Sequence, residues 1–326
     1  MAKHTPSDTH IVVLDGLDIL SGAEAWAPLA ALGQVRLEGL LPPAEAQAAA
    51  QAAELLLVTN RAGASARLIE HCPRLRYIGV LSTGYNTVDV AAAVQRGITV
   101  TNIPGYSTAS VAQLAFALLL ELCCHTGQHS RDVKSGLWRR GQQSAFHRYP
   151  LTELASKTLG LVGYGDIGRA VGHIAAAFGM RVVAHTRTPR PETPGVTFCT
   201  LDTLLSTADV VSLHCPLTGA TRGIIGVDAL AHMKPGALLL NTARGPLLDE
   251  AAVAAALHTG RLGGLGADVA AQEPISPESP LLTAPNCVLT PHIGWATHEA
   301  RSRLVAIAIE NVRAFLAGAP VNTVAP

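Results

Sequence analysis

The chain of 326 residues is long enough for two domains of ordinary size, and its 24 basic and 24 acidic side chains cancel to a formal charge of +0. A protein without a basic excess lacks the electrostatic footprint of a nucleic-acid or anionic-membrane binder, so neither partner is expected. Apolar residues make up 48% of the chain and charged residues 15%, which excludes global disorder.

Short apolar runs alternate with helix-favouring segments along most of the chain. The first strands are expected at 11–14, 55–58, 77–80 and 98–100, and the first helices at 44–53, 66–71 and 88–95. A long apolar helix at 111–124 links them to a second series. Its strands are expected at 159–162, 181–184, 210–213, 237–241, 264–268 and 288–289, with helices at 167–178, 201–206, 227–232 and 250–259. An amphipathic helix, roughly 298–317, closes the chain. This alternation predicts two Rossmann-like, doubly wound α/β domains with parallel sheets.

The start of the chain and its cysteines favour a cytoplasmic protein. Residues 1–10 are polar, and the apolar stretch 111–124 is shorter than the roughly 20 residues of a membrane span. None of the six cysteines forms a CxxC pair, so we interpret them as reduced thiols. His125 and His129 have helical spacing but no third ligand beside them, and no metal site is expected.

A GxGxxG pattern occupies residues 163–168, directly after a predicted strand and at the start of a predicted helix. There, Gly163 allows a tight turn, Gly165 lets the backbone approach a pyrophosphate, and Gly168 lets the helix pack on the strand. The helix N-terminus also favours negative charge. The pattern therefore predicts a dinucleotide site.

The end of the following strand bears on which dinucleotide binds. An NAD site usually has an acidic residue there for the ribose 2′-hydroxyl. This chain has none before Glu192, and instead carries Thr186, Arg187, Thr188 and Arg190. A carboxylate would repel a 2′-phosphate, whereas arginine binds one well. NADP is therefore favoured, with NAD as the alternative.

Three further segments, 241–247, 266–274 and 290–297, carry polar residues after predicted strand ends. Ligands of open α/β sheets bind at that edge. Among these residues, Arg244 can clamp a carboxylate, His292 can pass a proton near neutral pH, and Glu273 can orient that histidine.

With these motifs the chain resembles the D-isomer-specific 2-hydroxyacid dehydrogenase family. The resemblance covers nearly the whole chain and includes the glycine loop, HCPLT at 214–218, MKPG at 233–236, NTARG at 241–245, Glu-Pro at 273–274 and PHIG at 291–294. The segments NIPGYST at 102–108 and WAT at 295–297 are most similar to the glycerate dehydrogenase, or hydroxypyruvate/glyoxylate reductase, branch.

The resemblance implies roles for individual residues. Arg244 would bind the substrate carboxylate and carbonyl, His292 would be the acid/base, and Glu273 would be hydrogen-bonded to it. Backbone amides of the loop Ser82-Thr83-Gly84 would hold the substrate carboxylate, and Asp268 would receive the nicotinamide carboxamide. The other positions expected to line the cofactor are Thr108, Gly163, Gly165, Asp166, Ile167, Gly168, Arg187, Thr188, Cys215, Pro216, Thr221, Thr242 and Ala243.

The resemblance also implies a layout. Residues 1–103 with 296–326 would form the substrate-binding domain and 104–295 the dinucleotide-binding domain, with the active site in the cleft between them. A homodimer would form through the cofactor domains, with Trp138, His147 and Tyr149 on a loop reaching toward the partner. The role of Trp295 stays open between pocket wall and dimer packing. The expected reaction is reduction of a small 2-oxo acid, glyoxylate or hydroxypyruvate, by hydride transfer.

Other activities remain open on the same motifs. A D-3-phosphoglycerate dehydrogenase or a phosphite dehydrogenase would use the same scaffold, whereas formate enzymes carry Gln in place of Glu273. A dinucleotide-sensing corepressor would keep Arg244, Glu273 and His292, although the balanced charge disfavours it.

Overall fold

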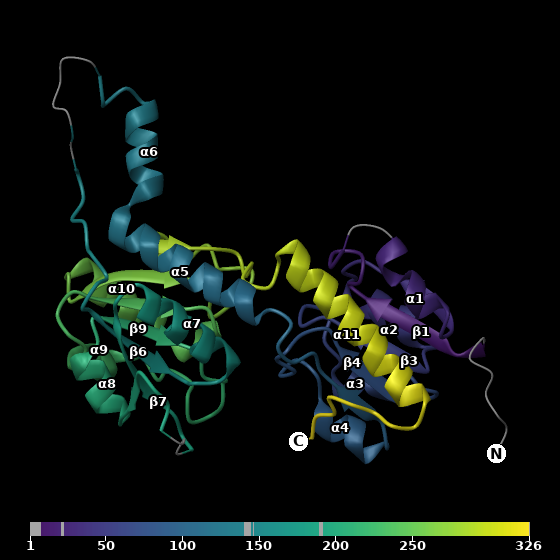
Figure 1. The fold of residues 1–326 in the computed structure, drawn as a ribbon. Helices are drawn as coiled ribbons and strands as arrows, with labels where there is room; N and C mark the ends of the chain where they lie inside the picture. Colours follow the sequence, from purple (N-terminus) through teal and green to yellow (C-terminus); the bar gives the residue numbers. More distant parts are fainter. Residues whose placement is uncertain (1–7, 21–22, 140–144, 146, 189–191, 326) are drawn as a thin grey trace. The chain divides into compact units, whose positions relative to one another are not determined.

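The computed structural model describes residues 8–20, 23–139, 145, 147–188 and 192–325. The chain divides into two compact units, each with its own sheet (Figure 1). The first unit comprises Met1–Ser107 and Ala296–Pro326, and the second comprises Thr108–Trp295. Every strand pairing within both sheets is parallel, which confirms the predicted fold class.

The first unit is built on a five-stranded sheet of order β2-β1-β3-β4-β5. Its strands are β1 (His10–Leu14), β2 (Gln34–Leu37), β3 (Leu55–Val58), β4 (Tyr77–Val80) and β5 (Thr99–Thr101). Its helices are η2 (Ala23–Trp26), α1 (Ala27–Ala30), α2 (Pro43–Ala50), α3 (Ala66–Glu70), α4 (Val90–Gln95) and α11 (His298–Leu316). Strands β3 and β4 are buried along their whole length, as is typical of parallel strands inside a sheet.

The C-terminal helix α11 belongs to this first unit although the whole second unit precedes it in the sequence. Phe315 packs against Tyr77 of β4, with ring centroids 4.8 Å apart. Asn311 Nδ2 donates to the carbonyl of Asn102 at 2.9 Å, and Asn322 Nδ2 donates to Asn311 Oδ1 at 2.8 Å. These contacts explain why the first unit is discontinuous in sequence.

The second unit is built on a seven-stranded sheet of order β12-β11-β10-β9-β6-β7-β8. Its strands are β6 (Thr158–Val162), β7 (Arg181–His185), β8 (Val196–Phe198), β9 (Val210–Leu213), β10 (Ala237–Asn241), β11 (Leu262–Ala267) and β12 (Cys287–Leu289). The chain begins this sheet at β6, builds outward through β7 and β8, and then crosses to β9 on the other side of β6. The junction of β6 and β9 is therefore the topological switch point, where open α/β sheets bind ligands.

Helices cover both faces of this second sheet. They are α5 (Thr108–Cys124), α7 (Asp166–Ala177), α8 (Leu201–Thr207), α9 (Val227–His232) and α10 (Glu250–His258); a further helix, α6 (Thr126–Lys134), belongs to the same unit. Residues of α5 and α7 build one apolar cluster, and residues of α8, α9 and α10 build another. Leu239 and Leu240 are neighbours on β10 yet belong to different clusters, because successive side chains of a strand point to opposite faces.

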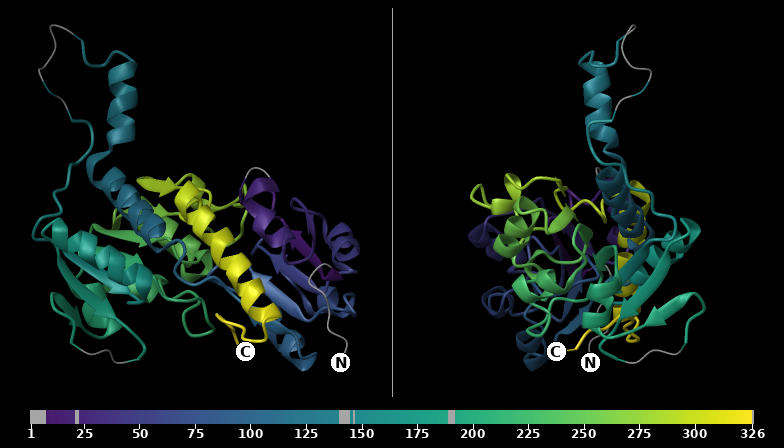
Figure 2. Two further views of the ribbon diagram at one scale, coloured as in Figure 1. Left: turned by 45° about the vertical axis from the view of Figure 1, so that its right-hand side comes forward. Right: turned by 90° about the vertical axis from the view of Figure 1, so that its left-hand side faces the viewer.

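Helix α6 projects away from the sheet of its unit (Figures 1 and 2). It follows α5 after His125, whose φ of 48° breaks the helix. Within the described part of the chain, no helix alone has the length and hydropathy of a membrane span. Helices α5 and α6 reach that criterion only as a pair bent by 57°.

Candidate functional site

The segments singled out in the second half of the sequence meet at one edge of the seven-stranded sheet. Each follows the carboxyl end of a strand. In spatial order the strands and the residues after them are β12 (His292), β11 (Asp268), β10 (Arg244), β9 (Cys215), β6 (Gly163) and β7 (Arg187). The proton-transfer candidates thus lie on one side of the switch point, and Arg187 lies on the other.

The glycine loop at the switch point has the shape of a phosphate cradle. Gly163 has a φ of +99°, and a Cβ there would lie 2.6 Å from the backbone nitrogen of Cys215. A Cβ on Gly168 would lie 2.4 Å from the Gly163 carbonyl oxygen, so α7 packs closely on β6. No heavy atom lies within 4 Å of a Cβ built on Gly165, the N-cap of α7, so the space next to this residue is open. The loop therefore fits the pyrophosphate of a dinucleotide.

Two threonines that were predicted to line the cofactor differ in what their hydroxyls do. Thr221 Oγ1 donates to the Pro216 carbonyl at 2.7 Å and accepts from the Thr218 amide at 2.8 Å, so it closes its own loop. Thr242 Oγ1 is buried and has no hydrogen-bond partner among the residues that the structure describes. A buried hydroxyl without a partner is costly, and a bound polar ligand would remove that cost.

The residues after β7 are those predicted to select the dinucleotide. Arg187 is exposed and has no ion-pair partner within the described chain. Thr186 Oγ1 donates to the Thr188 carbonyl at 2.8 Å, which shapes the turn. Arg190 lies outside the described residues. On the glycine loop, Asp166 is not free, because it pairs with Arg169.

His292 and Glu273 form a hydrogen-bonded pair at this sheet edge. His292 Nδ1 lies 2.6 Å from Glu273 Oε2. An ionised carboxylate only accepts hydrogen bonds, so Nδ1 is the donor and Nε2 is left for a ligand. Burial raises the pKa of the Glu273 carboxyl, but the hydrogen bond and charge of His292, the Ala270 amide and the charge of Arg244 together lower it more. The net pKa of Glu273 is below its ordinary value.

A buried aspartate, Asp268, holds the loop that carries His292. Asp268 is 2% exposed. Its Oδ1 accepts from Thr290 Oγ1 at 2.5 Å and from the Ile293 amide at 2.8 Å, and its Oδ2 accepts from the Gly294 amide at 2.7 Å. His292 lies between these anchors with a φ of 55°, a backbone conformation rare for residues other than glycine. Sequence reasoning missed this contact. The available signal was an aspartate directly after a strand and next to a second polar loop.

The Arg244 loop is held by a buried asparagine and packs on the loop that leads to Glu273. Asn241 Nδ2 donates to the Arg244 carbonyl at 2.9 Å, and its Oδ1 accepts from the Ala243 amide at 3.1 Å. A Cβ on Gly245 would lie 1.9 Å from the carbonyl carbon of Ala270. The structure therefore brings Arg244, Glu273 and His292 onto neighbouring loops of the second unit.

The loop Ser82-Thr83-Gly84 lies in the first unit, after β4. Ser82 Oγ hydrogen-bonds to Asn60 Oδ1 at 3.1 Å and to the Gly84 carbonyl. Thr83 Oγ1 donates to the Ile103 carbonyl at 2.9 Å. These side-chain bonds fix the loop at the carboxyl end of its own sheet.

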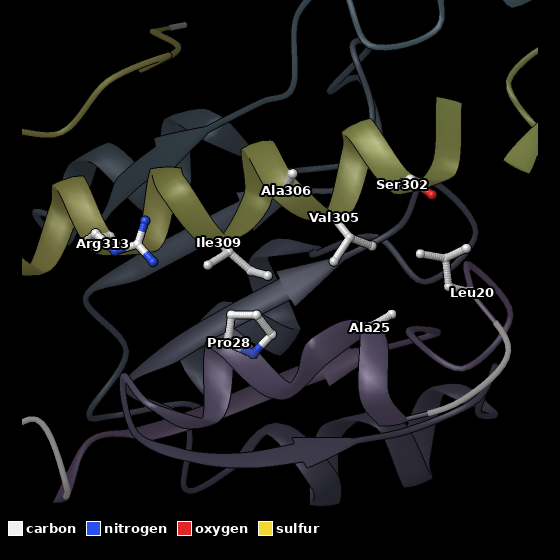
Figure 3. Close-up of a pocket in the computed structure, with 8 residues that line it drawn as sticks. All are labelled: Leu20, Ala25, Pro28, Ser302, Val305, Ala306, Ile309 and Arg313. Atoms are coloured by element: carbon white, nitrogen blue, oxygen red, sulfur yellow. The ribbon is translucent and has the colours of Figure 1, made fainter. Parts of the chain in front are cut away.

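A cavity of about 400 Å³ also lies in the first unit, between α11 and the segment of η2 and α1 (Figure 3). Its lining consists of Leu20, Ala25, Pro28, Ser302, Val305, Ala306, Ile309 and Arg313. The lining contains no histidine or carboxylate, and Arg313 pairs with Glu310. This cavity therefore does not have the side chains for proton transfer.

Comparison with known proteins identifies one family. Residues 116–294 match the family model for the D-isomer specific 2-hydroxyacid dehydrogenase, NAD binding domain. The chain is similar to hydroxypyruvate reductase of Blautia hydrogenotrophica, with 45% identity over 318 residues that cover 96% of this chain and 99% of the relative. Glycerate dehydrogenase of Methylorubrum extorquens is 38% identical over 289 residues, covering 88% of this chain and 90% of the relative.

A solved structure supports the same relationship. It is the NADPH-dependent glyoxylate/hydroxypyruvate reductase of Sinorhizobium meliloti in complex with NADP and malonate. The TM-score is 0.86 at 32% identity, and the match covers 98% of this chain and 97% of that one.

Proposed function

The chain belongs to the D-isomer-specific 2-hydroxyacid dehydrogenase family, and from that premise we propose that it reduces glyoxylate or hydroxypyruvate with NADPH. The observation that carries the proposal is the 2.6 Å hydrogen bond between His292 Nδ1 and Glu273 Oε2. That pair lies at the same sheet edge as a dinucleotide cradle and Arg244, a cation suited to a carboxylate.

His292 is the proton donor in this proposal. Glu273 accepts from Nδ1 and fixes the direction of the imidazole, so Nε2 is the nitrogen whose proton is transferred. When bound, the reduced nicotinamide supplies the hydride for C2 of the 2-oxo acid. His292 then gives its Nε2 proton to the oxygen that becomes the hydroxyl, and Glu273 retains the hydrogen bond to Nδ1.

Substrate binding in this proposal depends on charge and on backbone donors. Arg244 pairs with the carboxylate and polarises the carbonyl of the 2-oxo acid. The amides of Ser82-Thr83-Gly84 donate to the same carboxylate. Both groups orient C2 for reduction, and positioning of this kind supplies much of the rate in two-substrate reactions.

The dinucleotide is proposed to be NADP. Gly163, Gly165 and Gly168 receive the pyrophosphate, and exposed Arg187 pairs with the 2′-phosphate. The remaining cofactor-lining positions proposed are Thr108, Asp166, Ile167, Thr188, Cys215, Pro216, Thr221, Thr242, Ala243 and Asp268. The Sinorhizobium relative is described as NADPH-dependent, which supports this choice over NAD.

We also propose that the protein is a cytoplasmic homodimer. Helix α6 projects from the second unit, and Val133, Leu137 and Trp138 on or after it are 41%, 46% and 54% exposed. Apolar side chains clustered on a projecting element are typical of an interface. The free thiols of all six cysteines suit a reducing compartment.

The test is a set of initial rates with purified protein. Glyoxylate, hydroxypyruvate, pyruvate and 3-phosphohydroxypyruvate are each supplied with NADPH and with NADH. The proposal expects the highest kcat/KM for glyoxylate or hydroxypyruvate with NADPH. Preference for 3-phosphohydroxypyruvate would favour a phosphoglycerate dehydrogenase. NADPH binding without turnover of any acid would favour a dinucleotide sensor.

A further inference from the structure

Glu250 makes contacts beyond its own helix. It lies in the first turn of α10, where its side chain is half-buried. Its Oε1 accepts from the Ala271 amide at 2.7 Å, and its Oε2 accepts from Ser279 Oγ at 2.9 Å. The two oxygens thus bind the two ends of the segment 271–279. We call these two hydrogen bonds the Glu250 clamp.

The start of α10 does not itself require this side chain. Asp249 is the N-cap, and its Oδ1 accepts from the Ala252 amide at 3.1 Å. An acid in the first turn adds only a modest electrostatic gain. The direction in which the Glu250 carboxylate points therefore needs another explanation.

The segment between the two anchors carries Glu273. Ala270, the residue directly before this segment, donates its amide to Glu273 Oε1 at 3.2 Å and packs against Gly245. At the other end Ser279 is 8% exposed, so its hydroxyl has little access to water. The Glu273 side chain itself is 39% exposed, so it is only partly enclosed by its neighbours. Its position depends on how firmly the segment is held at its ends.

We propose that Glu250 is a positioning residue for the acid/base pair: by binding both ends of segment 271–279, it holds Glu273 Oε2 at His292 Nδ1. Its effect on turnover rests on the function proposed above, whereas its effect on the segment does not. In this proposal Glu250 acts through Glu273, because its carboxylate oxygens are bonded to the Ala271 amide and the Ser279 hydroxyl.

The variants separate position from charge. Glu250→Ala removes both hydrogen bonds, and Ser279→Ala removes one. Glu250→Gln keeps both, because its amide oxygen accepts from Ala271 and its amide nitrogen donates to Ser279 Oγ. Glu278→Ala is the matched control, since Glu278 is an exposed acid on the same segment.

Two measurements test the proposal on the full-length protein. Hydrogen exchange of peptides covering 271–279 should quicken in Glu250→Ala, and kcat for glyoxylate should fall about 10- to 100-fold with KM changed less than about threefold. Glu250→Gln should restore most of kcat, and Glu278→Ala should match the wild type. When Glu273 is already changed to Gln, the further change Glu250→Ala should lower kcat little more, because the effects of residues that act as a unit are not additive.

Unchanged exchange in Glu250→Ala, or faster exchange with unchanged kcat, overturns the proposal. The proposal is also overturned if the fall in kcat caused by Glu250→Ala adds fully to the fall caused by Glu273→Gln. Hydrogen exchange does not depend on turnover. A wild-type protein that reduces none of the 2-oxo acids would therefore refute the proposed function, while exchange still decides whether Glu250 holds the segment.

Discussion

At the scale of single residues, the sequence indicated the polar residues that gather at the sheet edge. It did not indicate the buried and half-buried carboxylates whose hydrogen bonds hold the loops that carry them. The gathering of Arg244, Glu273 and His292 was predictable because polar residues after parallel strands meet at one edge. The hydrogen bonds of Asp268 and Glu250 were not predictable. They depend on which backbone amides face the carboxylates, and that direction is set only when the loops fold against one another.

Glu273→Gln should separate charge from hydrogen bonding. The glutamine oxygen can still accept from His292 Nδ1, but it carries no negative charge beside the imidazole, so kcat should fall about 10- to 100-fold with little change in cofactor affinity. Steady-state rates and NADPH titrations measure both quantities. An unchanged kcat would show that Glu273 is not the partner that His292 needs.

The lowered pKa of Glu273 leads us to expect that the stability of the protein depends on pH. The pKa of Glu273 is lowered in the folded protein, so its ionised form stabilises the fold above the unfolded value of about 4.3. That stabilisation is lost as the pH falls through the folded pKa. The wild type should therefore exceed Glu273→Gln in free energy of unfolding at pH 7, and the difference should shrink as the pH falls below about 4.3. Urea unfolding at pH 7 and at a series of lower pH values measures it, and a difference independent of pH would refute it.

Arg187→Ala tests the choice of dinucleotide. Loss of the guanidinium should raise KM for NADPH at least about tenfold, since a charged hydrogen bond contributes about 1.5–3 kcal/mol, and should leave KM for NADH nearly unchanged. Arg181→Ala is the control, because Arg181 is exposed at the opposite end of the same strand. Equal losses with both dinucleotides would contradict a role in 2′-phosphate binding.

At the scale of elements, the hydrophobic pattern predicted the buried strands well and the exposed elements poorly. Strands β3, β4, β9 and β10 appear with the bounds expected of them, because continuous apolar runs are buried on both faces. Strand β2, with sequence QVRL, has no buried residue and lies at the sheet edge, so its sequence carries no burial signal. Helix α6 is polar and projects from its unit, and it was missed for the same reason.

Contact between two loops gives a prediction at this scale. Gly245→Ala places a Cβ 1.9 Å from backbone atoms of Ala270, so one loop must move. We expect a loss of about 1–3 kcal/mol in free energy of unfolding, together with a fall in kcat. Gly39→Ala is the control, since no heavy atom lies within 4 Å of its Cβ. Wild-type stability and rate in Gly245→Ala would show that the two loops are not in close contact.

At the scale of the whole molecule, the amphipathic pattern of residues 298–316 predicts a helix but does not say which unit it joins. The contacts of Asn311 and Phe315 with β4 and the segment after β5 decide that. Such long-range pairings are invisible to local patterns. The overall balance of charge likewise does not say where the charges lie, and Arg187 and Arg244 both follow strands of one sheet edge.

The proposed homodimer is a prediction at this scale. Light scattering coupled to size exclusion should give twice the chain mass of 33.8 kDa. The double variant Val133→Ser with Trp138→Ser should shift the protein toward monomer, because it removes apolar surface from the projecting segment. Val227→Ser, at a site 69% exposed on α9, should not. A monomeric wild type would refute the dimer.

The most direct test of the account is the rate of glyoxylate and hydroxypyruvate reduction by wild type and His292→Ala, with NADPH affinity measured on both proteins. If His292 donates the proton, kcat should fall about 10²- to 10⁴-fold while the Kd for NADPH changes less than about twofold. A variant that keeps the wild-type kcat, or that loses rate and NADPH affinity in equal measure, would contradict the assignment of His292 as the proton donor.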